Sequence, residues 1–141
     1  MKILNCKLLS KEEARKVDNK LRKAEYNWSL HSAGPFKEEA AFVNGEYGYV
    51  YDYGYIIKFE SGVRPALYLE SNVGKSFKLA GHNWINVFDN VYLCEDLIGK
   101  SIFNNLSDGN DYEGSVIQKY VLSWCKSKNI EFNTEINFEE M

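Results

Sequence analysis

The sequence contains little proline and cysteine, with only two prolines and three cysteines among 141 residues. Cys6, Cys94 and Cys125 are odd in number and widely spaced, a pattern that matches neither a zinc ribbon nor a disulfide framework. Free thiols that are buried or half-buried are typical of proteins in a reducing cytoplasm. We therefore predict a cytoplasmic protein without disulfides.

Long apolar runs and a basic excess are also missing. No stretch approaches the roughly 18 uninterrupted apolar residues of a membrane span, and Asn5, Cys6 and Lys7 interrupt the only apolar run near Met1. Seventeen basic side chains stand against 20 acidic ones, for a formal charge of −3. Because phosphate affinity comes mainly from basic residues, we expect neither a membrane segment nor direct binding of nucleic acid.

Residues typical of catalysis and cofactor binding are sparse. His31 and His82 have no partner nearby in the sequence, and the Gly74–Ser76 triplet lacks the upstream glycine of a phosphate loop. We predict a non-catalytic protein without a cofactor. The alternative, an enzyme, would need one of the histidines beside a carboxylate or a thiol in a pocket.

The segment Asp108–Glu113 is rich in oxygen ligands of the kind that suit calcium, but it lacks the full EF-hand pattern. Acidic residues before a helix also stabilise the positive end of that helix. We favour the second explanation and predict no metal site.

Helix and strand signals coexist along the chain. Ser10 and Ser115 are expected to begin two helices, the first of about 14 residues. Short apolar runs separated by turn residues predict seven or eight short, mostly antiparallel strands. Five of these runs are Ala40–Asn44, Val63–Leu69, Ser76–Ala80, Asn83–Phe88 and Val91–Glu95. Together the elements indicate a single α+β domain.

Tyrosine is abundant, with ten residues, and five of them alternate along one segment. These five are Tyr47, Tyr49, Tyr51, Tyr53 and Tyr55. On one continuous strand they would share a face, but we expect Asp52 and Gly54 to divide the segment into two strands. Tyrosine combines a large rigid surface with a polar tip, so these rings are the main candidate binding residues, with burial in the core as the alternative. Arg64, next to Pro65, is expected to pair with a carboxylate or carbonyl inside the domain, or to recognise an anion.

Several motifs resemble a bacterial and phage domain family of unknown function, itself similar to the C-type-lectin-like fold of formylglycine-generating enzymes and variable phage receptor-binding proteins. The matching stretches of the first half are Leu8–Ala14, Ala40–Asn44 and Gly62–Leu67, with Trp28 near the family's tryptophan segment. The second half matches at Trp84–Val87, Tyr92–Glu95 and Ser115–Leu122.

In that family the second half normally comes first, so the resemblance implies a circular permutation in which residues 70–75 join halves 1–69 and 76–141. The two ends of a compact domain usually lie close together, so joining them costs little conformational entropy. We predict a non-catalytic recognition module on this scaffold, with the five tyrosines, Arg64 and Trp28 as the residues that bind a protein partner. The alternative is a small phage or mobile-element inhibitor of a host defence nucleoprotein or enzyme. The chain is expected to be a monomer or a dimer that exchanges halves.

Overall fold

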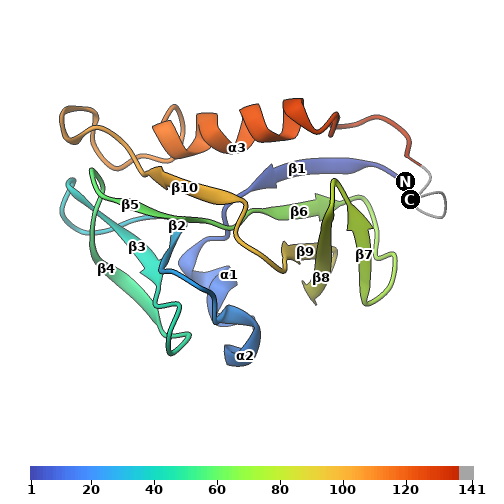
Figure 1. Ribbon diagram of the computed structural model, residues 1–141, viewed down its shortest axis with the longest axis horizontal. Helices are drawn as coiled ribbons and strands as arrows, with labels where there is room; N and C mark the ends of the chain where they lie inside the picture. Colours follow the sequence, from blue (N-terminus) through green and yellow to red (C-terminus); the bar gives the residue numbers. More distant parts are fainter. Residues whose placement is uncertain (137–141) are drawn as a thin grey trace.

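The computed structural model describes residues 1–136 and shows an α+β fold with two five-stranded sheets (Figure 1). The first sheet has the order β1 (Ile3–Lys7), β6 (Ala66–Leu69), β9 (Val91–Cys94), β8 (His82–Phe88) and β7 (Ser76–Leu79). The second has the order β10 (Gly99–Ile102), β5 (Glu60–Val63), β2 (Trp28–Ala33), β3 (Glu39–Val43) and β4 (Val50–Ile56). The helices are α1 (Lys11–Arg15), α2 (Asn19–Arg22) and α3 (Val116–Ser127), with a 3-10 turn at Leu106–Asp108. The predicted fold class is confirmed, although the ten strands exceed the expected seven or eight.

The chain passes from the second sheet to the first at Arg64 and Pro65. The sequence predicted one strand over Val63–Leu69, and the structure instead ends β5 at Val63 and begins β6 at Ala66. Proline has no amide hydrogen, so it cannot donate to a strand ladder, and pairing stops there. The prediction of a single strand was therefore wrong.

The first predicted helix is also divided in two. α1 begins at the expected cap, where the Ser10 hydroxyl accepts from the Glu13 amide and the Glu13 carboxylate accepts from the Ser10 amide. The backbone then leaves the helical region at Asp18, whose carboxylate accepts from the Lys20 amide at 2.9 Å and so begins α2. Aspartate competes with helix continuation in this way, and the apolar stripe alone did not indicate it.

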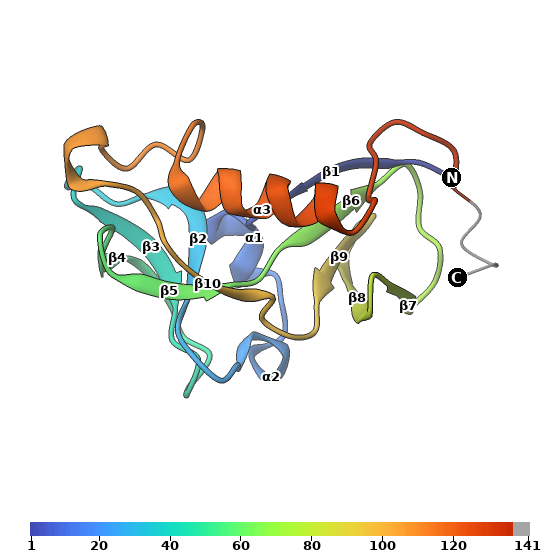
Figure 2. The same ribbon diagram turned by 45° about the horizontal axis from the view of Figure 1, so that its top comes forward.

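Helix α3 spans the junction of the two sheets. It contacts β1 of the first sheet and β10 of the second, and Figures 1 and 2 show it lying across both. Its predicted start is confirmed, because the Ser115 hydroxyl accepts from the Gln118 amide at 3.1 Å. The predicted meander is confirmed as well, since β7, β8 and β9 pair in order as antiparallel neighbours.

The two halves of the chain interlock. β1 and β6, from the first half, share a sheet with β7, β8 and β9, whereas β10 of the second half pairs with β5 of the first. The joint at 70–75 is fastened to the first sheet, because the buried Tyr92 hydroxyl accepts from the Val73 amide and donates to the Gly74 carbonyl. Lys2 forms a β-bridge with Glu135, so both ends of the described chain are adjacent, whereas Met141 lies outside the described residues.

The core is formed by two adjoining apolar clusters. One packs β1, β6 and α3 together and includes Trp84, and the other packs α1 against the second sheet and includes Trp28. All three cysteines are buried free thiols. Within residues 1–136, no helix has both the length and the apolar character needed to span a bilayer.

Buried thiol and phenol groups make the free energy of unfolding depend on pH in the alkaline range. Burial raises the pKa of Cys94 from 9.0 to about 12, and burial followed by the nearby Glu13 raises the pKa of Tyr68 well above 10.0. The native state therefore holds these protons more tightly than the unfolded state does. Their stabilising contribution is complete below about pH 9 and is lost as the pH rises toward the native values. Burial lowers the pKa of Arg64 to about 10, which opposes this loss above that pH.

We expect urea denaturation at pH 10 to give a free energy of unfolding about 1–3 kcal/mol lower than at pH 7.5. Cys94→Ala removes one of the raised groups and should reduce the difference by about 1 kcal/mol. Equal stability of the wild-type protein at the two pH values would contradict this account.

Candidate functional site

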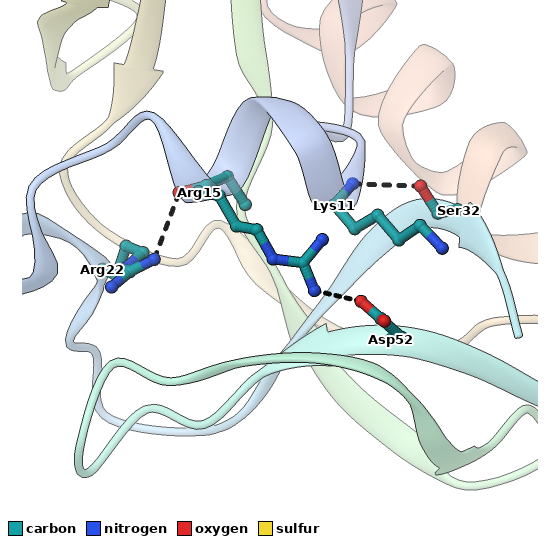
Figure 3. Close-up of polar contacts among 6 residues, drawn as sticks. Lys11, Arg15, Arg22, Ser32 and Asp52 are labelled. Atoms are coloured by element: carbon teal, nitrogen blue, oxygen red, sulfur yellow. Dashed lines mark hydrogen bonds and ion pairs between the residues drawn. The ribbon is translucent and has the colours of Figure 1, made fainter.

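One face of the second sheet is closed by α1. Figure 3 shows two polar contacts that tie this helix to the second sheet, since the Lys11 amide donates to the Ser32 hydroxyl of β2 at 3.0 Å and Arg15 pairs with Asp52 of β4. Between these ties, Ala14 packs in the apolar cluster that contains Trp28. At this edge of the sheet, the opposite face of β3 and β4 is therefore the face that remains available for contact with another molecule.

Three aromatic rings lie in a row on that opposite face. Phe42 of β3 is stacked on Tyr51, with 4.9 Å between ring centroids, and lies 5.3 Å from Tyr55. We call Tyr51, Phe42 and Tyr55 the aromatic row. The tyrosine spacing predicted its two outer rings, but Phe42 was missed. Residues Ala40–Val43 are all apolar, so the sequence has no alternation that would indicate an outward ring at Phe42.

The tyrosine segment forms one strand rather than two, so that prediction was wrong. β4 is continuous over Val50–Ile56, but its pairing with β3 shifts register between Ala40 and Phe42. Gly54 accommodates the irregularity with a φ of 111°, a conformation that other residues rarely adopt. Asp52 and Gly54 thus distort the strand without ending it.

The five tyrosines do not form a single ladder. Tyr47 and Tyr49 stack on each other in the β3–β4 loop at 5.7 Å, and Tyr53 lies apart, with its Cβ close to Gly34. Four of the five are exposed, between 42% and 56%, and Tyr55 is half-buried. The alternative that most of these rings are sealed in the core is therefore wrong.

A pocket of about 410 Å³ opens beside Tyr55. Tyr26 and Tyr55 contribute its aromatic surfaces, and the buried Ser61 and Gly62 contribute its floor. A side chain on Gly62 would meet the Asn27 carbonyl at 3.0 Å, so the close packing of this floor requires glycine. Asn27 also lines the cavity and is half-buried. The other four lining residues are exposed and charged: Glu25, Glu46, Glu60 and Lys100. We call this cavity the Tyr55 pocket.

Polar contacts hold the walls of the Tyr55 pocket in place. The Tyr55 hydroxyl donates to the Glu60 carbonyl, and burial, followed by the Glu60 charge, raises the pKa of Tyr55. The Ser61 hydroxyl lies 2.5 Å from that of Ser29. The Lys100 ammonium rests over the Tyr26 ring, 3.5 Å from its centroid.

Arg64 and Trp28, both predicted to contact a partner, are structural residues instead. Arg64 is 2% exposed and Trp28 is fully buried, so neither reaches the surface. The Arg64 guanidinium donates to the carbonyls of Leu21, Cys94 and Glu95 at 2.6, 2.7 and 3.1 Å, and it lies 5.0 Å from the Trp28 ring centroid. The expected carbonyl partners are confirmed, and the roles in binding are corrected.

The two histidines occupy different surroundings. His31 lies 4.4 Å from the Tyr112 ring and lines a hollow of about 420 Å³ that also contains Asp111 and Glu113. Burial, and then Lys7, lower the pKa of His31, which favours the neutral ring. In the described part of the chain, no hydrogen bond joins that ring to a carboxylate. His82 packs edge-on against Trp124 at 5.6 Å.

Side chains of the Asp108–Glu113 loop are engaged in contacts that shape it. Asn110 donates to the carbonyls of Gly34, Phe36 and Glu39, and Glu113 accepts from the Gln118 amide group. Among residues 1–136, no three histidine, cysteine or acidic side chains gather where they could hold a metal ion. The loop thus connects α3 to the β2–β3 turn.

The chain was also compared with known proteins. A scan of protein-family models and searches of curated proteins and of solved structures each find no match.

Proposed function

We propose that this chain is a non-catalytic recognition module that binds a protein partner through the aromatic row and the Tyr55 pocket. The exposure of Tyr51, at 42% on the uncovered face of an edge strand, is the observation that carries the proposal. Aromatic side chains are enriched at the centres of protein interfaces because they remove a large rigid surface from water at a small entropic cost.

The surroundings of the row support this use. Its rings support one another, since Phe42 lies between Tyr51 and Tyr55, and α1 holds β4 from behind through Asp52. A partner would therefore meet a surface that is already ordered, which lowers the entropic cost of binding. The stacked Tyr47 and Tyr49 extend the aromatic surface into the neighbouring loop.

The alternative function, an inhibitor of a host defence nucleoprotein or enzyme, would use the same surface. Three glutamates line the Tyr55 pocket, and a basic site on such a target would complement them. The two proposals differ in the identity of the partner, and the following experiment identifies it.

A photoreactive phenylalanine analogue at Tyr51 should form an adduct with one protein in a lysate of the source cells. The same analogue at the exposed Ser123 of α3 is the matched control and should form none. With the purified partner, Tyr51→Ala should lower the affinity at least tenfold, roughly the loss of one interface anchor.

Tyr51→Ala should leave the protein folded. The ring is exposed and its main contact is the stack on Phe42, so we expect the free energy of unfolding to fall by only about 0.5–1.5 kcal/mol. Adducts at Ser123 but not at residue 51, or unchanged affinity of Tyr51→Ala, would contradict the proposed surface.

A further inference from the structure

We infer that the Tyr55 pocket receives an arginine side chain of the protein partner. The inference rests on the proposed function and adds the chemistry of the recognised group. The pocket has a volume of about 410 Å³, within the range of sites that hold small ligands and ample for a guanidinium group and its stem. Tyr55 belongs both to the lining of the pocket and to the aromatic row, so the pocket adjoins the row.

The charged residues that line the Tyr55 pocket favour a positively charged ligand. Glu25, Glu46 and Glu60 line it, and Lys100 is the one basic residue among its lining. None of these three carboxylates forms an ion pair with any cation of residues 1–136. A bound cation would thus meet acceptors that the folded chain leaves unpaired, which is the charge complementarity found between interacting proteins.

One positive group of the chain already occupies the aromatic wall. The Lys100 ammonium lies 3.5 Å from the centroid of the Tyr26 ring, well within the distance of a favourable cation–π contact. The wall therefore accepts a cation in the geometry that an incoming side chain would use. Lys100 is exposed on a flexible stem and makes no ion pair in the described chain, so it can move aside.

The shape and the acceptors favour arginine over lysine. A guanidinium is planar, so it can stack on Tyr26 or Tyr55 while its five N–H groups point to acceptors around its edge. Ser61, 3% exposed, lies at the floor, and its hydroxyl has acceptor capacity beyond the contact with Ser29. An ammonium is a compact point charge and would satisfy fewer of these groups at once.

The test is a titration of the ¹⁵N-labelled protein with N-acetyl-arginine amide, followed by amide chemical shifts. Saturable shifts are expected at Asn27, Ser61 and Gly62, with a dissociation constant in the millimolar range. The matched probe N-acetyl-citrulline amide has nearly the same shape without the charge, and it should produce no saturable shift. N-acetyl-lysine amide should bind at least threefold more weakly than the arginine probe.

Variants define the charge requirement. The triple change Glu25→Gln, Glu46→Gln and Glu60→Gln should weaken the arginine probe at least tenfold, and the distant Glu70→Gln should not change its affinity. Lys100→Met removes the competing ammonium and should strengthen binding twofold to fivefold.

Equal binding of the citrulline probe, equal binding of the lysine probe, or absence of saturable shifts at the pocket would overturn the inference. Because this titration needs no partner, its outcome is independent of the adduct experiment at Tyr51. Failure of the pocket and failure of the proposed surface can therefore be told apart.

Discussion

Arg64→Met is expected to lower the free energy of unfolding by about 3–5 kcal/mol, because a buried cation that serves three carbonyls is lost. Those carbonyls belong to Leu21, Cys94 and Glu95, and the guanidinium thereby ties α2 to the end of β9. Methionine fills much of the same space but donates no hydrogen bond, so the three carbonyls lose the guanidinium as their partner. Urea denaturation at pH 7.5 measures the change.

Arg64→Lys is the matched control for charge. Lysine keeps the positive charge but cannot span three carbonyls with one compact ammonium, so we expect a loss of about 2 kcal/mol. Binding of the arginine probe by folded Arg64→Lys should match that of the wild type, since Arg64 does not line the Tyr55 pocket. A change in stability below about 1 kcal/mol for Arg64→Met would show that these three contacts contribute little.

Trp28→Ala is expected to cost about 3–5 kcal/mol, the range for truncating a large aromatic side chain in a core. Trp28 is fully buried, its ring packs under Arg64, and its indole N–H donates to the Arg22 carbonyl at 3.0 Å. We expect this variant to unfold in one cooperative transition at a lower urea concentration than the wild type, rather than by a change confined to one loop.

Trp28→Phe separates the two parts of that effect. Phenylalanine retains an aromatic ring for Arg64 but lacks the N–H donor, so we expect a loss of about 1–2 kcal/mol. A double-mutant cycle of Trp28→Ala with Arg64→Met should show a coupling of about 1–2 kcal/mol from the desolvated cation–π contact. Additive effects would contradict a direct interaction between the two residues.

Local signals in the sequence were sufficient for several elements. Ser10 and Ser115 mark helix starts because each hydroxyl satisfies an amide that the first turn leaves free. The β7–β9 meander follows from short apolar runs separated by Gly81-His82 and Asp89-Asn90. These features depend on residues a few positions apart, so the sequence alone specifies them.

Features that depend on residues far apart in the chain could not be predicted from the sequence. β2 and β10 lack a strong local pattern and become strands by pairing, β2 with β3 on one side and β5 on the other, and β10 with β5. The Tyr55 pocket collects Glu25, Glu46 and Glu60 from three separate segments, and no spacing in the sequence indicates that they meet. Arg64 and Trp28 were included among the predicted binding residues, but both are buried and structural, and burial depends on the tertiary fold.

The resemblance to a lectin-like family and the circular permutation stay predictions. The interlocked halves and the bridge between Lys2 and Glu135 are compatible with a permuted order. They arise equally in any fold whose ends meet at one edge of a sheet.

Hydroxyl-radical labelling of the protein, free and bound to the partner identified through the Tyr51 adduct, is the most direct measurement. Binding is expected to protect Tyr51, Tyr55 and Tyr26, while Tyr120 and Trp124 of α3 keep their labelling. Protection of Tyr120 and Trp124 with unchanged labelling of the aromatic row would contradict this expectation, and would place the interface on the helix instead.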